Sequence, residues 1–374
     1  MKNRLLLLFV LAISINAKAQ FSTQTISVNG VNRQFRQYLP SGLNNNEQVP
    51  LIIALHGLGD DMTNFQNVGF SLFADTARFI CLFPQGLNND FVGASSWNNG
   101  TLLASPADDI GFINRMIDSM YVNYNIDLSR VYICGFSMGG IMSYNATCAL
   151  PYRIAAMASV SGTMSTSDIN NCNPGRAIPV MHMHGTADGT VPYNAGALPS
   201  LSLVPATLEF WKNNNGHTDS TMVALPDIAA GDGITVDKFI YTGGNAEFNF
   251  WRENNADHQW LYYPVNDIDA TIEIWLFFRD KVHPNVSQVG VNENAAAAKL
   301  SVFQSGSDVV VKADKGLQAV EVYDMQGKLL SKANAPQNTT EMRLNTGQQA
   351  NQIVLVKTLV SNVWVTKRVA LMAN

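Results

Sequence analysis

The sequence has 374 residues, which is enough chain for one full-sized domain and a second, smaller one. Only 14% of the residues are charged, and the formal net charge is −5. Nucleic acids need a strongly basic surface, so this composition argues against a nucleic-acid partner and favours a site for a neutral substrate.

The N-terminal segment 1–19 has the pattern of a secretory signal peptide. Lys2 and Arg4 precede an apolar stretch over 5–12, and alanines at positions 17 and 19 form an A-x-A pattern that predicts cleavage before Gln20. The alternative is a membrane anchor, but a spanning helix needs roughly 20 apolar residues and this stretch is shorter. We therefore expect a secreted protein without stable membrane insertion.

From there to residue 283, apolar runs alternate with segments of helical pattern. Strands are expected at 51–55, 79–83, 131–134, part of 154–160, 180–184 and 248–251, with helices at 109–121, 206–212 and 268–278. Strands that are apolar along their whole length indicate a parallel sheet covered on both faces. The predicted fold class is α/β, an α/β-hydrolase three-layer sandwich with a mostly parallel sheet over residues 20–283.

A G-x-S-x-G motif at 135–139 follows the expected strand 131–134. In this context Ser137 would lie on a sharp strand-to-helix turn that exposes its hydroxyl to substrate. Gly135 and Gly139 leave room where a Cβ would collide as the strand and the helix come close. The alternative is a flexible glycine-serine turn, but the apolar strand before the motif favours a nucleophile.

The acid and the base should follow the serine along the chain, in that order. Asp188 comes just after the apolar run 180–184 and is the predicted acid, with a solvated turn aspartate as the alternative. His258 follows the strand-like run 247–251 and is the predicted base.

The other five histidines are expected to have different roles. His56 and His184 each precede a glycine at a strand end, and we expect them to orient the nearby backbone rather than transfer protons. His182 is expected to lie in the core. His217 lies in a polar run, and His283 follows the last helix of the domain. A zinc site at His182 and His184 would lack further ligands, so we expect neither a metal nor another cofactor.

Acyl transfer also needs N–H donors for the oxyanion that develops on the substrate carbonyl. The backbone N–H of Met138, directly after the nucleophile, is the first predicted donor. The second is the N–H of Leu58, in the glycine-rich turn that ends the run 51–59, with one residue on either side left open.

Several segments are similar to those of secreted esterases grouped with polyhydroxybutyrate depolymerases and feruloyl or acetylxylan esterases. The similar segments are 108–113, 124–132, 135–140, 153–156, 184–188 and 267–271, within an overall resemblance over about 24–279. The resemblance implies a carboxylic ester hydrolase with Ser137 as nucleophile, Asp188 as acid and His258 as base. The family often has glycines just before this histidine, whereas this chain has Asp257, which could compete for the imidazole.

The substrate is less narrowly defined by the sequence. Trp97, in the polar loop 88–99, and Trp260 are expected to contact a feruloyl ring or a sugar, although both could instead cap the core. The resemblance implies an enzyme that acts on feruloyl or acetyl esters of plant cell-wall polysaccharide, and we expect a monomer. Alternatives are a polyhydroxyalkanoate polyester, a peptide substrate, or a non-catalytic binding protein on the same fold.

After residue 278 the composition changes. A polar, small-residue stretch at 284–298 predicts a linker, and alternating apolar runs at 299–374 predict a small β-sandwich. This region resembles the C-terminal sorting domain of type IX secretion substrates, which implies the secretion machinery as a partner, export and removal of the domain. A carbohydrate-binding module is the alternative, but Tyr323 and Trp364 are the only large rings that could support it.

The four cysteines divide into two groups. An exported chain permits disulfides, and Cys148 and Cys172 flank loops around the nucleophile helix, so we expect them to pair. Cys81 and Cys134 lie in apolar strand patterns and are expected to be buried thiols.

Overall fold

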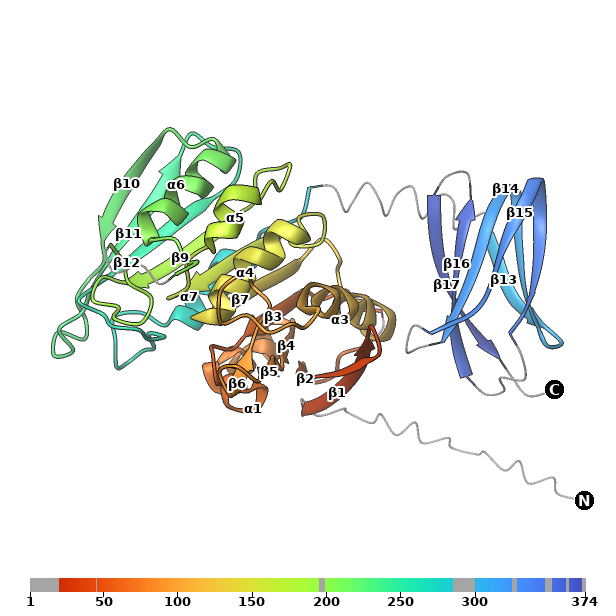
Figure 1. Cartoon of the computed structure of the whole chain (residues 1–374), viewed down its shortest axis with the longest axis horizontal. Coiled ribbons are helices and arrows are strands. Elements are labelled where there is room, and N and C mark those ends of the chain that lie inside the picture. Colours follow the sequence, from red (N-terminus) through yellow and green to blue (C-terminus); the bar gives the residue numbers. More distant parts are fainter. Residues whose placement is uncertain are drawn as a thin grey trace, which may run out of the picture.

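The computed structural model describes residues 20–44, 46–194, 199–284, 300–324, 328–346, 352–360 and 363–371. The expected signal peptide and, apart from residue 284, the expected linker lie outside these ranges. Within them, no helix combines the length and the apolar character that a bilayer span requires. Figure 1 shows an α/β region, coloured from red to cyan, and a β-rich region in blue.

A ten-stranded sheet forms the centre of the α/β region (Figure 1). In spatial order its strands are β1 (Gln20–Val28), β2 (Val31–Leu39), β4 (Ile80–Pro84), β3 (Leu51–Leu55), β7 (Val131–Phe136), β8 (Ala156–Val160), β9 (Val180–Gly185), β12 (Phe248–Asn254), β11 (Thr235–Thr242) and β10 (Asp219–Ala224). The strands from β4 to β12 in this order are parallel, and antiparallel strands extend both edges. This arrangement confirms the predicted α/β-hydrolase class.

Helices cover both faces of the sheet, which explains why its central strands are apolar throughout. One face packs against α3 (Asp109–Tyr124), α4 (Met138–Ala149), α5 (Thr166–Asn171) and α6 (Val204–Asn215). The other packs against α1 (Met62–Phe65), α2 (Ala74–Ala77) and α7 (Ala270–Phe278), with the short 3₁₀ helices Gln66–Val68 and Phe70–Leu72 between α1 and α2. The parallel strands end at a common edge, where α/β folds place their functional loops.

The antiparallel strands on the two sides of the parallel ones were not anticipated from the sequence. Every residue of β10 is exposed, and β2 alternates between exposed and buried positions. Such strands lack the continuous apolar run that marks a strand buried on both faces, so their hydrophobic signal is weak.

The C-terminal region is β-rich, as the alternating apolar pattern predicted, and its described strands form one antiparallel sheet, where the sequence predicted a small β-sandwich. Its strands are β13 (Leu300–Ser305), β14 (Asp308–Asp324), β15 (Leu329–Asn345), β16 (Gln352–Val360) and β17 (Val363–Leu371). The long strand β14 pairs with β13, β15 and β16, and its register shifts near Leu317. Valine and leucine side chains form a hydrophobic core within this region.

The cysteines follow the expected division. A disulfide joins Cys148, near the end of α4, to Cys172, which caps α5, with Cα atoms 5.3 Å apart. Cys81 and Cys134 are free and buried, and burial raises the pKa of both thiols. The disulfide therefore ties the helix that begins at the G-x-S-x-G motif to the next helix along the chain.

Candidate active site

Ser137 occupies the sharp turn between β7 and α4. Its backbone has φ 55° and ψ −120°, a conformation that non-glycine residues adopt only when the surrounding structure holds them there. Two backbone hydrogen bonds do so, from Ser137 N–H to the Val160 carbonyl at 2.8 Å and from Ile141 N–H to the Ser137 carbonyl at 3.0 Å. The strand-turn-helix geometry is that of a nucleophile elbow.

The glycines of the motif are required by close backbone contacts. A Cβ on Gly135 would collide with the backbone of Gly139, and a Cβ on Gly139 would collide with the Leu55 carbonyl. A Cβ on Gly162 would lie 2.5 Å from the Ser137 carbonyl oxygen. Strand β3, the elbow and the loop after β8 therefore meet at distances that only glycine permits.

Asp188 and His258 are brought together from loops that follow two neighbouring strands. Asp188 follows β9, His258 follows β12, and His258 Nδ1 lies 2.8 Å from Asp188 Oδ2. The other carboxylate oxygen, Oδ1, accepts the backbone N–H groups of Thr190 at 2.9 Å and Val191 at 2.7 Å. These bonds fix the orientation of the carboxylate toward the imidazole.

A second histidine also contacts this carboxylate. His184 Nε2 lies 3.3 Å from Asp188 Oδ2 and 2.8 Å from the Val191 carbonyl oxygen. Burial alone would raise the pKa of Asp188, but hydrogen bonds from His184, His258 and the Val191 N–H outweigh it and hold that pKa well below its usual range. Asp188 is therefore ionised and able to stabilise a positive charge on His258.

Asp257 does not take the imidazole of His258. Its Oδ1 accepts the backbone N–H of His258 at 2.8 Å and that of Gly189 at 3.1 Å. These backbone hydrogen bonds lower the pKa of Asp257. The residue thus links the loop of the predicted base to the loop of the predicted acid, and the imidazole remains paired with Asp188.

The imidazole of His258 lies against the residue that precedes the predicted nucleophile. Its ring centroid is 4.9 Å from that of Phe136, the last residue of β7. Trp260 also packs near Phe136, at 6.4 Å between centroids, and its indole N–H donates to Thr271 Oγ1 at 3.0 Å. The structure therefore brings all three predicted triad residues to one end of the sheet.

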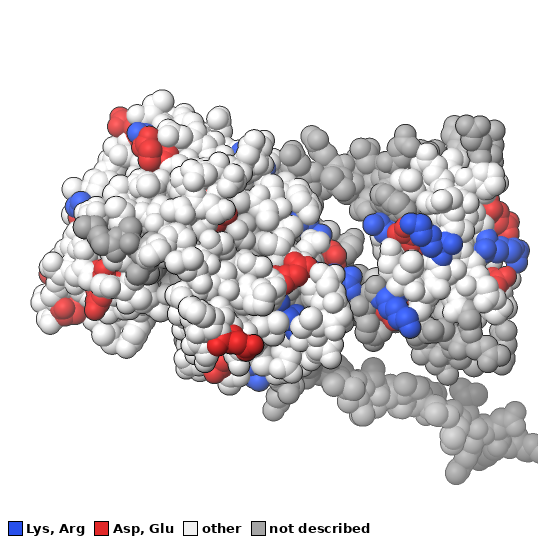
Figure 2. Space-filling view, viewed as in Figure 1, with Lys and Arg blue, Asp and Glu red and all other residues white. Residues whose placement is uncertain are grey.

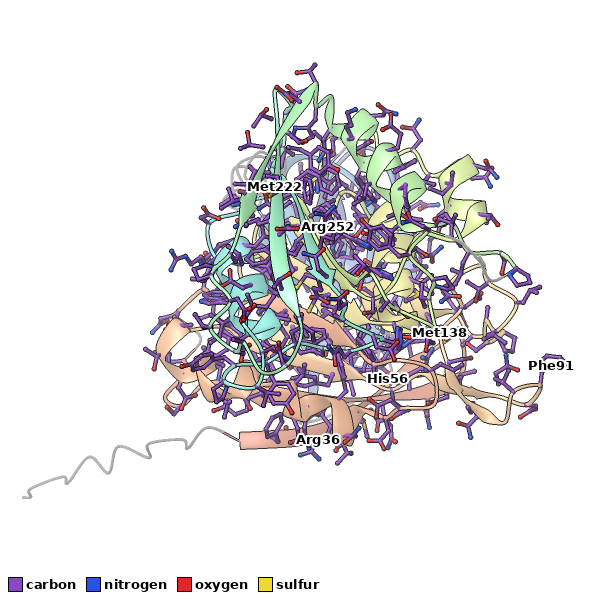
Figure 3. All side chains as sticks on the ribbon, turned by 90° about the vertical axis from the view of Figure 1, so that its left-hand side faces the viewer. Arg36, His56, Phe91, Met138, Met222 and Arg252 are labelled. Carbon is purple, nitrogen blue, oxygen red and sulfur yellow. A yellow bond between two sulfur atoms is a disulfide. The ribbon has the colours of Figure 1, made fainter. Side chains whose placement is uncertain are left out.

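The predicted oxyanion donors lie beside the elbow. The Met138 N–H is in the first turn of α4, where helical N–H groups have no partner within the helix. A Cβ on Gly57, which precedes Leu58, would lie 3.4 Å from the Ser137 Cβ. Figure 3 shows Met138 and His56 at the same end of the sheet.

Trp97 does not lie where the sequence placed it. Its side chain is 0% exposed, and the indole N–H donates to the His56 carbonyl oxygen at 2.8 Å. The expected substrate contact at Trp97 is therefore wrong, because a fully buried ring beneath the loop after β3 cannot touch a bound ester. Trp260 is only partly buried.

Glu253 is a buried acid near the site that the sequence analysis missed. It lies in β12, is fully buried, and neither carboxyl oxygen has a hydrogen-bond partner among the described residues. Burial, together with the negative charge of Asp188, raises the pKa of Glu253 to about 8. At neutral pH Glu253 is thus mainly protonated while Asp188 is ionised, as expected for two acids whose environments push their pKa values apart.

The raised pKa of Glu253 predicts a pH-dependent stability. Between about pH 4.5 and 8, Glu253 is protonated in the folded chain and ionised in the unfolded chain. The free energy of unfolding therefore falls as the pH rises through this range, by up to about 1.4 kcal/mol per pH unit. Glu253→Gln removes this titration. We expect the Tm of the variant, minus that of the wild type, to increase steadily from pH 5 to pH 8.5 in thermal unfolding. Parallel Tm curves would contradict the assignment.

In the part of the chain that the structure describes, no group of three or more His, Cys, Asp or Glu side chains is arranged so that it could hold a metal ion. His182 is a buried core residue, and its Nδ1 lies 2.7 Å from the Tyr144 hydroxyl. The arrangement of Ser137, His258 and Asp188 fits nucleophilic catalysis by a serine.

Comparisons with known proteins identify the family. Residues 43–219 match the phospholipase/carboxylesterase family, and residues 289–371 match a domain of unknown function. The probable feruloyl esterase C of Aspergillus clavatus is 30% identical over 210 residues, which cover 54% of this chain and 67% of that protein. The bifunctional acetylxylan esterase/xylanase of Neocallimastix patriciarum is 35% identical over 44% of this chain and 22% of that protein.

Two further comparisons concern a polyester depolymerase and a solved structure. The poly(3-hydroxyalkanoate) depolymerase C of Paucimonas lemoignei is 29% identical over 46% of this chain and 42% of that protein. The acetyl xylan esterase from Aspergillus awamori superposes with a TM-score of 0.51 at 14% identity, over 69% of this chain and 98% of that one, and shares the fold. The chain spans between 22% and 42% of the length of the first three curated relatives. From the fold, the elbow and these relatives, the chain belongs to the phospholipase/carboxylesterase family of α/β-hydrolases, a family of carboxylic ester hydrolases.

Proposed function

We propose that the protein is a serine esterase that hydrolyses carboxylic esters through an acyl-enzyme on Ser137. The observation that carries this proposal is the Asp188–His258 hydrogen bond, with the imidazole packed against the residue before the elbow serine. The proposal also draws on the relatives, whose names include acetylxylan esterase and feruloyl esterase.

In the proposed reaction, Ser137 Oγ attacks the ester carbonyl carbon and His258 Nε2 takes its proton. Asp188 accepts a hydrogen bond from the Nδ1–H of the imidazole, which keeps its proton, and the carboxylate stabilises the positive charge of the ring. The N–H groups of Leu58 and Met138 bind the oxyanion. The C–O bond then breaks, and the departing alcohol takes the proton from His258. Water, deprotonated by His258, attacks the acyl-enzyme, and Ser137 regains its proton as the acid leaves.

Feruloyl or acetyl esters of plant cell-wall polysaccharide are the proposed substrates. The similarity to a feruloyl esterase and an acetylxylan esterase supports this class. A neutral polymer also suits the surface, because Figure 2 shows few charged side chains on the visible face of the α/β region. Trp260, partly buried against Phe136, is the proposed aromatic contact for the acyl group.

A polyhydroxyalkanoate polyester is the second candidate substrate. It is favoured by the similarity to the depolymerase of Paucimonas lemoignei. The cleaved bond would again be a carboxylic ester, so the same triad would serve, and only the groups that hold the acyl and alcohol parts would differ.

We also propose that the protein is secreted. The signal-peptide pattern at 1–19 supports export, and the C-terminal antiparallel region, with its own core, is the proposed sorting domain. Mass spectrometry of the protein secreted by its native host would show an N-terminus at Gln20, and loss of the C-terminal region if that region is removed.

A fluorophosphonate probe and a substrate panel test the proposed activity. We expect the probe to modify Ser137 in the folded wild type and leave Ser137→Ala unlabelled. Methyl ferulate, acetylated xylan, 4-nitrophenyl acetate and polyhydroxybutyrate would then identify the preferred ester. An unlabelled wild type that hydrolyses none of the four would instead indicate a binding protein on this fold.

A further inference from the structure

A buried histidine controls the backbone at the start of the predicted oxyanion loop. His56 directly follows β3, is fully buried, and its Nδ1 lies 2.7 Å from the Gly57 carbonyl oxygen. On the other side of the ring, the Gly86 N–H donates to His56 Nε2 at 3.0 Å. Both ring nitrogens are therefore engaged with backbone groups.

These two contacts determine the protonation state of the ring. The Gly86 N–H can only donate, so Nε2 must carry the lone pair, and the ring proton must be on Nδ1. Nδ1–H then donates to the Gly57 carbonyl oxygen, which can only accept. Burial lowers the pKa of His56, in agreement with a neutral ring.

The orientation of the Gly57 carbonyl sets the direction of the next N–H group. In a trans peptide the C=O and the following N–H point in opposite directions. His56 and the Asp60 N–H, at 3.3 Å, both hold the Gly57 oxygen on one side of the chain. The Leu58 N–H therefore points to the opposite side, and no acceptor takes it among the described residues. Gly57 is also the point at which this loop passes Ser137.

We propose that His56 is a positioning residue for the reaction: by holding the Gly57 carbonyl, it aims the Leu58 N–H at the oxyanion formed when Ser137 attacks. This inference rests on the proposed esterase function and deepens it. A donor that is already oriented needs no rearrangement as charge develops on the substrate oxygen.

Neighbouring residues pack closely around the imidazole of His56. Trp97 packs 4.8 Å from the imidazole centroid and donates to the His56 carbonyl oxygen. A Cβ on Gly86 would lie 3.2 Å from the ring and 2.7 Å from the Ser96 carbonyl oxygen, so glycine is needed there. The buried Trp97 thus supports the oxyanion loop from beneath.

The β5–β6 hairpin (Leu87–Asn89 and Ala94–Ser96) holds the far side of the same loop. The Gly59 N–H donates to the Ser95 carbonyl oxygen at 2.9 Å, and Ser95 Oγ donates to the Asp60 carbonyl oxygen. The loop is therefore fixed on both sides of Leu58, which leaves its N–H direction little freedom.

A comparison of an ester with its thionoester, in which sulfur replaces the carbonyl oxygen, distinguishes this role from a purely structural one. The sulfur of a thionoester accepts hydrogen bonds weakly, so an aligned oxyanion donor accelerates the oxygen ester more than the thionoester. We expect His56→Phe to lower kcat for methyl ferulate by about tenfold or more, to change KM by less than about threefold, and to reduce the ester-to-thionoester ratio of kcat/KM by about tenfold.

Two amide variants and one control complete the test. An Asn side chain can place an N–H near the Nδ1 position of His56, and a Gln side chain cannot. We therefore expect the ester-to-thionoester ratio of kcat/KM to fall less in His56→Asn than in His56→Gln. His217→Phe removes another buried histidine, outside the site, and should leave the ratio unchanged. If His56→Phe fails to fold, the Asn and Gln variants decide the question. An active wild type whose His56 variants keep the full ratio would overturn this inference alone, whereas an inactive, unlabelled wild type would overturn the proposed function.

Discussion

Ser137→Ala is expected to reduce kcat for the preferred ester by on the order of 10³ or more. The variant removes the proposed nucleophile, while the proposed oxyanion donors and the rest of the site remain. Alanine has no larger side chain than serine, so the elbow should keep its unusual backbone conformation and KM should change little. Steady-state kinetics on purified protein of matched Tm would measure the effect.

A second serine on the same helix provides the matched control. Ser143 is buried in α4, and its hydroxyl donates to the Gly139 carbonyl oxygen at 2.8 Å. We expect Ser143→Ala to keep turnover within about threefold of the wild type, because it loses one ordinary hydrogen bond. Near wild-type turnover by purified Ser137→Ala would remove this serine from the proposed role.

The elbow could be predicted from sequence because its determinants are local. An apolar strand, two glycines spaced around a serine, and a helix all lie within about 20 residues, and each requirement is visible in the residue types. The order of triad residues along the chain then limited the search for Asp188 and His258 to the ends of two later strands. Their hydrogen bond follows from β9 and β12 being parallel neighbours.

The roles of Trp97 and Glu253 could not be predicted in the same way. A tryptophan in a polar loop looks exposed in sequence, and its burial depends on His56, 41 residues earlier in the chain. Glu253 lies in a strand that also contains Arg252, so the pair looks like a solvated strand end. Its unpartnered burial beside the Asp188 loop results from the register of β12 against β9 and β11.

Asp188→Asn tests the electrostatic part of the mechanism. We expect kcat to fall by about 10⁴ at neutral pH. Because Oδ1 accepts two backbone N–H groups, the oxygen of the new amide should take that position. Its NH₂ group would then face His258 Nδ1, which can accept that bond only when its own proton is on Nε2. A histidine in that tautomer cannot take the proton of Ser137.

Asp257→Asn is the matched control for the same change. This exposed carboxylate accepts only backbone N–H groups, from Gly189 and His258, and an amide oxygen can still accept them. We expect this variant to keep turnover within about fivefold of the wild type. The two variants each remove one negative charge near the same imidazole, so an effect of net charge alone would lower turnover in both. A large loss confined to Asp188→Asn would show that the direct bond to Nδ1, and thereby the tautomer of His258, determines the rate.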